Sequence, residues 1–323
     1  MKFVVFKFVS NRTIFLIVEH KPTAIWKMTE KPFKGKVVLV TGSNRGIGRG
    51  IACEFGTAGA TVYVTARKDD ENSLEEVVKE IKVRGGDGHA VYCDHSQPSE
   101  IKKLFEQIEN EQNGQLDVLV NNAHEGIEFV LKHLGTKFFE YSQPPEDVFD
   151  LQANVGLRGA YIASFYAAKL MVKNKSGVIV NIGSKAGIHH MMDVAYGATK
   201  TALDRLSADC AIELHPHNVT VIDLWPGATH TETMSGNFVG GDTNAKNIYQ
   251  SIYYSGRILV QLLQTANLHD RTGQILTTNT LGEELGVKDV DGTTPRDTKI
   301  DQYLDFIDVL NKVRCKPMAS RSS

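Results

Sequence analysis

Cysteine and charge of one sign are both scarce in this sequence, and each shortage excludes a class of protein. The 323 residues contain 4 cysteines, which lie far apart at Cys53, Cys93, Cys210 and Cys315 without a CxxC pair. This spacing argues against a disulfide framework or a cysteine metal site, so we expect small core residues in a reducing compartment. Lysine plus arginine (36) nearly balance aspartate plus glutamate (38), and no long run carries one sign. Nucleic acid is therefore not a predicted partner.

An uninterrupted hydrophobic run long enough to cross a membrane is also absent. The stretch 1–21 is apolar, but Lys7 and the triplet Asn11-Arg12-Thr13 interrupt it. A signal peptide would need an unbroken apolar segment and a small-residue cleavage site, and neither is evident. Residues 1–33 are expected to be an extension, either dispensable, a weak membrane-surface anchor or a poor targeting segment. The expected location is the cytoplasm or the cytoplasmic face of an intracellular membrane.

From residue 34 onward, apolar runs alternate with amphipathic stretches, which is the pattern of parallel strands joined by helices. No repeat or low-complexity segment interrupts it. The sequence predicts an α/β, doubly wound, Rossmann-type domain over residues 34–323, with one seven-stranded parallel sheet. The predicted strands are 36–42, 61–67, 89–94, 116–123, 177–184, 219–227 and 274–279, and predicted helices include 46–59, 73–86 and 99–113.

The first strand ends in TGSNRGIGRG, a turn rich in glycine. Gly42, Gly46 and Gly48 lie where the chain leaves a strand, turns sharply and starts a helix whose amide groups favour an anion. A side chain would block the approach of a pyrophosphate. We therefore predict a dinucleotide site that also includes Asn44 and Arg45, with Ile47, although such glycines also occur in plain strand-to-helix connections.

Charge indicates which dinucleotide binds. An acidic residue at the end of the second strand usually holds a free ribose, but that strand ends here in Thr65-Ala66-Arg67-Lys68. Arg45 and Arg67 are placed to contact a 2′-phosphate, unless both are solvated surface arginines. NADPH is therefore expected in preference to NADH.

A tyrosine and a lysine stand one helical turn apart in the segment AYGATK, at Tyr196 and Lys200. Positions i and i+4 share one face of a helix, so the two side chains project together. A free phenol has a pKa of about 10, and a neighbouring ammonium group favours the phenolate. The lysine would make the tyrosine usable as a proton donor, although this spacing is also common on ordinary helices.

Several motifs together resemble the short-chain dehydrogenase/reductase family. They are TGSNRGIG, the triplet NNA at 121–123, Ser184 twelve residues before Tyr196, the YGATK segment and Pro226-Gly227. The resemblance covers roughly residues 34–235. Further stretches, including TVYVTAR, LDVLVNNA and NVGLRGAY, resemble a carbonyl reductase branch of that family.

The resemblance implies roles for individual residues. Tyr196 would give a proton to the substrate carbonyl oxygen, Ser184 would hold that oxygen, and Lys200 would assist the tyrosine and bind the nicotinamide ribose. On the cofactor side, the resemblance implies Asp94 at the adenine amino group, Asn121 along the adenosine, Thr231 at the carboxamide, and Pro226 with Gly227. Asp94 and Thr231 also have purely structural interpretations, as a helix cap and as a loop hydroxyl.

Two departures from the family pattern affect the proton path. The family usually has an asparagine where this chain has Gly156, and Asn154, two residues earlier, points about 200° away on a helix. The relay is expected to be altered but not abolished, and Gly156→Asn is the first restoration to test. His124 replaces the usual glycine after NNA, either as a second proton group or as a loop residue without a role.

The substrate is predicted to be a bulky apolar carbonyl compound. Met191 and Met192 and a substrate loop at about 228–250, with Phe238, Tyr249, Tyr253 and Tyr254 in or beside it, suggest an apolar pocket, unless they are core residues. His189 and His190 have no further ligands at suitable spacing, so no metal is expected.

The predicted function is an NADPH-dependent carbonyl reductase, reversible as an alcohol dehydrogenase, for lipophilic ketones, aldehydes, quinones or steroid-like substrates. A non-catalytic dinucleotide-binding sensor or scaffold is the alternative from another class. The resemblance also implies a homodimer or homotetramer that pairs through the helices near 147–173 and the helix carrying Tyr196.

Overall fold

The computed structural model describes residues 2–9, 12–19, 30–68, 73–237, 249–296 and 303–314. Asn11, Phe238 and Cys315, together with residues 238–248 of the predicted substrate loop, lie outside the described residues. Cys53 and Cys93 are buried and Cys210 is half-buried, and all three are free thiols. Burial raises the pKa of Cys93 to about 12 and that of Cys210 to about 11, as expected for core residues.

The predicted seven-stranded parallel sheet is present, with the strand order β5-β4-β3-β6-β7-β8-β9. Val40 of β3 pairs with Val64 of β4 on one side and with Val120 of β6 on the other, which is where the order reverses direction. Cofactors of doubly wound folds bind at such a reversal, beyond the carboxyl ends of the strands. The strands are β3 (Val37–Val40), β4 (Thr61–Ala66), β5 (Asp87–Tyr92), β6 (Val118–Asn121), β7 (Gly177–Ile182), β8 (Val219–Trp225) and β9 (Ile275–Thr277).

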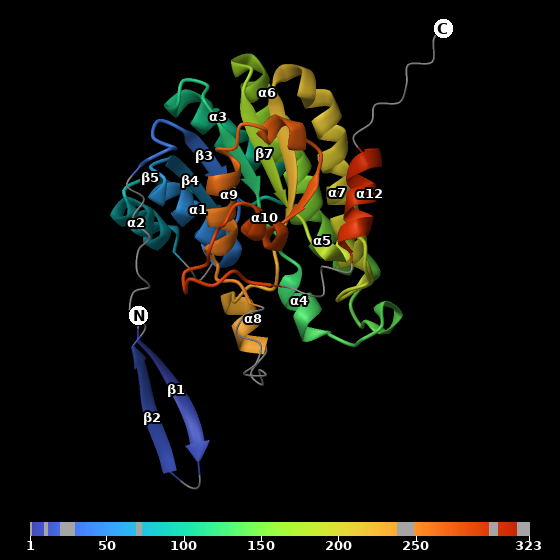
Figure 1. The fold of residues 1–323 in the computed structure, drawn as a ribbon. Helices are drawn as coiled ribbons and strands as arrows, with labels where there is room; N and C mark the ends of the chain where they lie inside the picture. Colours follow the sequence, from blue (N-terminus) through green and yellow to red (C-terminus); the bar gives the residue numbers. More distant parts are fainter. Residues whose placement is uncertain are drawn as a thin grey trace.

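Helices cover both faces of the sheet (Figure 1). One face packs against α1 (Gly46–Thr57), α2 (Leu74–Arg84), α9 (Tyr254–Leu262) and α10 (Thr278–Glu284). The other packs against α3 (Pro98–Glu111), α6 (Ala160–Asn174) and α7 (Val194–Leu214). The described residues also form α4 (Ile127–Lys132), α5 (Pro145–Ala153), α8 (Glu232–Asn237) and α12 (Leu304–Arg314), and a π-helical turn over Asn154–Gly159 joins α5 to α6.

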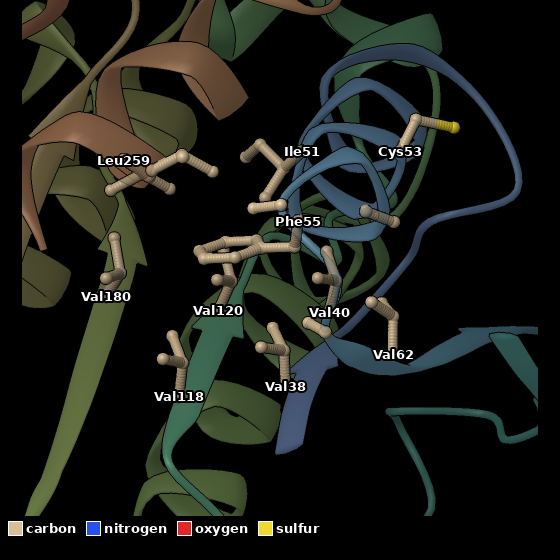
Figure 2. Close-up of a cluster of buried hydrophobic side chains, with 14 of the residues drawn as sticks. Val38, Val40, Ile51, Cys53, Phe55, Val62, Val118, Val120, Val180 and Leu259 are labelled. Carbon is tan, nitrogen blue, oxygen red and sulfur yellow. The ribbon is translucent and has the colours of Figure 1, made fainter. Parts of the chain in front are cut away.

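The core between α1 and the sheet explains why the strand sequences are apolar almost throughout. Figure 2 shows the Phe55 ring of α1 lying over Val118 and Val120 of β6, with β3 valines beside it. Burying such a ring contributes roughly 1.5–3 kcal/mol. Phe33 packs edge-on against Phe55, with ring centroids 5.1 Å apart, and its backbone amide donates to Ala58 O. The packed domain therefore includes Phe33, just before the expected start at residue 34.

The extension forms a separate two-stranded antiparallel sheet of β1 (Lys2–Val9) and β2 (Arg12–Glu19), in which Val9 pairs with Arg12. No strand was predicted in this region. In the part of the chain that the structure describes, none of the helices combines the length and apolar character that crossing a membrane requires.

Candidate active site

A cleft of about 900 Å³ opens beyond the carboxyl ends of the central strands. Ligand pockets typically have volumes of roughly 300–1,000 Å³. The cleft brings together the glycine turn after β3, the loop after β6, and the segments after β7 and β8. Of the predicted site residues, it is lined by Gly42, Asn44, Arg45, Gly46, Ile47, Arg67, Asp94, Ser184, Tyr196, Lys200, Pro226, Gly227 and Thr231.

The catalytic candidates Ser184, Tyr196 and Lys200 are all buried and all line this cleft. Ser184 follows β7, and its hydroxyl oxygen accepts from the Ala186 amide at 3.2 Å. The Lys200 ammonium lies 5.8 Å from the centre of the Tyr196 ring and donates to the Ile182 carbonyl at 2.9 Å. A lysine ammonium has three donors, so this contact leaves others for a ligand.

The start of α7 sets the position of Tyr196. Asp193 is the N-cap, and its carboxylate accepts from the Tyr196 amide at 2.6 Å. An aspartate at this position satisfies an amide group that the helix cannot. The cap places Tyr196 in the first turn and Lys200 one turn later on the same face.

The backbone of the glycine turn passes very close to neighbouring segments of the chain. Gly42 has a φ of +60°, and a Cβ there would lie 2.7 Å from the Cα of Ala123. A Cβ on Gly48, which does not itself line the cleft, would lie 2.4 Å from both Asn122 Nδ2 and Gly42 O. These positions therefore require glycine.

The first amide of α1 already binds an anionic group. The Gly46 amide donates to the Glu232 carboxylate at 3.0 Å. Glu232 is the first residue of α8. Helix amino ends favour negative charge through their unpaired amides and dipole, so this contact shows the preference expected of a phosphate site.

The two arginines lie at the cleft and are held by acidic residues. Arg45 donates to Thr233 Oγ1 at 2.7 Å and pairs with Glu128 at 2.8 Å. Arg67 pairs with Glu125 at 2.5 Å.

Asp94 and Thr231 line the cleft, and both side chains also accept hydrogen bonds from backbone amides a few residues away. An adjoining hollow of about 520 Å³ is lined by residues that include Arg67 and Asp94, so it continues the cleft past the end of β4. Asp94 Oδ1 accepts from the Ser96 amide at 2.8 Å, and Thr231 Oγ1 accepts from the Met234 amide at 3.2 Å. Asp94 therefore stabilises its own loop but does not cap α3, whose N-cap is Gln97. The Thr231 hydroxyl binds an amide at the amino end of α8.

Asn121, like Gly48, is a predicted site residue that does not line the cleft. Its side-chain amide donates to Asn181 Oδ1 at 2.8 Å and to Ser164 Oγ at 3.0 Å, in a buried polar network. Its neighbour Asn122 lines the cleft instead. The acidic residues Glu125, Glu128 and Glu232 also line it, and nothing in the sequence pattern marked them.

Part of the predicted apolar pocket is present. Met191 and Met192 line the cleft together with Ile127, Phe129 and Met234. Tyr253 and Tyr254 do not, because both pack into the core cluster between α1 and α9. The structural alternative therefore holds for these two tyrosines, while Tyr249 stacks on His230 with ring centroids 4.5 Å apart.

Two buried carboxyl groups lie beside the segment carrying the catalytic residues. Asp223 of β8 has no exposed surface, and Asp204 of α7 is nearly as buried. Trp225 Nε1 donates to Asp204 Oδ1 at 3.2 Å. Burial, and then the charge of Asp223, raises the pKa of Asp204 to about 10, so the pair retains a proton near neutral pH.

No three His, Cys, Asp or Glu side chains are grouped as a metal site would require among the described residues. Of the two departures from the family pattern, His124 lines the cleft and contacts Tyr196, with ring centroids 5.5 Å apart. Gly156 does not line the cleft and belongs to the π-helical turn beside the His124 ring.

Comparison with known proteins gives consistent matches. The family model of the short chain dehydrogenases matches residues 36–238. The chain is 42% identical over 276 residues to dehydrogenase/reductase SDR family member 1 of Mus musculus, covering 82% of this chain and 87% of that protein. It is 40% identical over 292 residues to the Homo sapiens protein of the same name, covering 87% of this chain and 90% of that protein. A short chain dehydrogenase from Burkholderia cenocepacia J2315, solved in complex with NADP, matches with a TM-score of 0.63 and 26% identity over 76% of this chain and 97% of that one.

Proposed function

The chain belongs to the short-chain dehydrogenase family, as an NAD(P)-dependent oxidoreductase acting on alcohol or carbonyl groups, and we propose a narrower function for it. We infer that it is an NADPH-dependent carbonyl reductase for lipophilic substrates. The observation that carries the proposal is the meeting of Ser184, Tyr196 and Lys200 in one cleft with the amino end of α1. The same residues serve alcohol oxidation in reverse.

A nicotinamide dinucleotide fits the residues present. Neither Gly42 nor Gly48 has room for a side chain, and the Gly46 amide donates a hydrogen bond to an anionic group, the Glu232 carboxylate. When bound, the cofactor supplies the hydride. The glycine turn would hold its pyrophosphate and Lys200 its nicotinamide ribose.

Side chains of the protein then protonate and orient the carbonyl oxygen of the substrate. Tyr196 donates its phenolic proton to that oxygen, and Ser184 Oγ hydrogen-bonds to it and fixes its position. The amino end of α7 and the Ile182 carbonyl hold Tyr196 and Lys200 in place before substrate arrives. Preorganised donors of this kind stabilise charge that develops on an oxygen in the transition state.

The choice of NADPH rests on the two arginines and on the lack of an acid at the end of β4. Arg45 and Arg67 line the cleft, and Arg67 also lines the adjoining hollow. Guanidinium groups bind phosphate through charge-assisted hydrogen bonds. The Burkholderia neighbour was solved in complex with NADP, which supports the same choice here.

The apolar lining supports a lipophilic substrate. Met191, Met192 and Phe129 offer adaptable and aromatic surface beside Tyr196.

Exposed aromatic side chains on two helices support a homodimer or homotetramer. Phe149 of α5 and both Tyr161 and Phe165 of α6 are about half exposed. Aromatic residues are enriched at protein interfaces.

The test is NADPH consumption, beside NADH, over a panel of lipophilic ketones, aldehydes and quinones. Tyr196→Phe removes the proton donor and keeps the ring, so turnover should fall by a factor of roughly 100 or more. NADPH binding without turnover of any carbonyl compound would refute the reductase and favour the non-catalytic sensor.

A further inference from the structure

The imidazole of His124 lies directly beside the catalytic tyrosine. His124 follows β6 and is half-buried, with both ring nitrogens shielded from solvent, and it meets the Tyr196 ring edge-on at an interplanar angle of 66°. The ring also lines the cleft, so it lies between the protein interior and the reaction site.

Gly156 makes the space for this ring. A Cβ at position 156 would lie 2.6 Å from His124 Nδ1, closer than real Cβ atoms approach a neighbour, so the ring would have to move. Gly156 belongs to the π-helical turn Asn154–Gly159. Such π-helical turns within α-helices are frequent at functional sites.

The polar atoms around His124 form an incomplete set. Within the described chain, neither ring nitrogen of His124 has a hydrogen-bond partner, and the same holds for Gln152 Oε1. Gln152 is buried, and its amide nitrogen donates to Gly126 O at 3.1 Å. It also lies close enough to His124 to raise the imidazole pKa, although the contact is not a regular hydrogen bond.

The charge state of the ring follows from its surroundings. Burial, followed by the positive charge of Lys200, lowers the pKa of His124 to about 3. The imidazole is therefore neutral near physiological pH, with one nitrogen as a donor and the other as an acceptor. Such a ring can accept a hydrogen bond on one side while it donates on the other.

We propose that His124 is a positioning residue for the reaction: seated in the space left by Gly156, it provides the hydrogen-bonding group through which the Tyr196–Lys200 pair regains its proton. This inference rests on the proposed reductase function. In the reduction direction Tyr196 loses a proton to the substrate oxygen, and one must return from solvent. A neutral imidazole serves this transfer by accepting a proton at one nitrogen and releasing one from the other, so its net charge does not change.

The decisive variant is His124→Phe, which keeps a flat ring against Tyr196 and removes both nitrogens. We expect kcat to fall roughly 10-fold or more, because a proton path is lost. The dissociation constant for NADPH should stay within about 2-fold and thermal stability should not fall, since two buried polar atoms without partners are removed. His124→Gln, which retains a donor and an acceptor, should recover part of kcat. The control is His89→Phe, a substitution in β5 far along the sheet.

Each outcome has a distinct meaning. An active wild type with an equally active His124→Phe variant overturns the inference and leaves the reductase intact. Parallel loss of kcat and stability also overturns it, because packing alone would explain both. A wild type that turns over no carbonyl compound refutes the reductase, and the relay falls with it.

The pairing of the two positions has its own test in stability. Gly156→Asn alone should destabilise the fold by driving a side chain into the ring, and adding His124→Ala should relieve that loss. Additive losses in the double variant would show that the two residues do not share this space.

Discussion

Replacing Arg67 by alanine should change which cofactor the enzyme prefers, and the structure allows the size of the change to be worked out. The Arg67 side chain is 50% exposed and pairs with Glu125 at 2.5 Å. A charge-assisted hydrogen bond contributes about 1.5–3 kcal/mol, whereas an exposed ion pair contributes at most about 1 kcal/mol. Because Arg67 is half exposed and would exchange Glu125 for the phosphate, we expect the lower end, about 1.5 kcal/mol.

That loss corresponds to roughly a 10-fold weaker affinity for NADPH. NADH lacks the 2′-phosphate, so its affinity should change by less than about 2-fold. The measurements are dissociation constants by titration calorimetry and kcat/KM with each cofactor. Arg205→Ala removes an exposed arginine that pairs with Asp209 on α7, and it serves as the matched control.

The acidic partner of Arg67 provides a second control. Glu125→Gln keeps the size of the side chain and removes its charge, so NADPH affinity should hold or improve. Equal losses for NADPH and NADH in Arg67→Ala would refute the assignment, because the arginine would then serve the cofactor without reading its 2′-phosphate. No loss with either cofactor would make Arg67 a solvated surface residue.

Three further predictions follow from contacts around the site and in the core. Glu232→Gln should tighten cofactor binding several-fold, because a carboxylate no longer competes for the Gly46 amide; calorimetry measures it, and unchanged affinity would contradict it. Gly50→Ala should destabilise the fold by about 2 kcal/mol or more, because its Cβ would lie 1.7 Å from the Ile252 carbonyl oxygen; chemical denaturation measures it. Burial raises the pKa of Asp204 to about 10, above its pKa of about 4 in the unfolded chain. The free energy of unfolding should therefore fall as pH rises from about 4 toward 10, and Asp204→Asn should reduce this fall. If the melting temperatures of the wild type and of Asp204→Asn changed equally between pH 5 and pH 9, this prediction would be contradicted.

The sheet was predictable because its signals are local. The segment GVIVNI of β7 is apolar almost throughout, is preceded by Ser176 and is followed by a glycine. Such a run suits a strand covered on both faces. The glycines of the first turn were equally informative, since a side chain at Gly42 would meet the backbone of Ala123. The N-terminal pair of strands was missed because its apolar stretch was interpreted as a membrane anchor, a targeting segment or a dispensable extension, and none of these predicts strands.

The facing of single side chains was harder to predict. Asn121 and Asn122 are neighbours at the end of β6, and successive side chains of a strand point to opposite sides. One of them had to face away from the cleft, and the sequence does not say which. Asn181 and Ser164 bind Asn121 in the interior, whereas Asn122 donates to the Gly42 carbonyl at 2.8 Å. Tyr253 illustrates the same limit, because its ring lies against Arg84 of α2 and its hydroxyl donates to Glu80, away from the cleft.

The two departures from the family pattern are a single structural feature. Positions 124 and 156 lie far apart in the sequence, so each was interpreted alone, and Gly156→Asn was expected to restore what the family has. The structure shows that a Cβ at position 156 would lie 2.6 Å from His124 Nδ1. An asparagine there would displace the ring that occupies its space. The single restoration should therefore harm the enzyme, and only a change at both positions can test whether the asparagine and the histidine serve the same proton path.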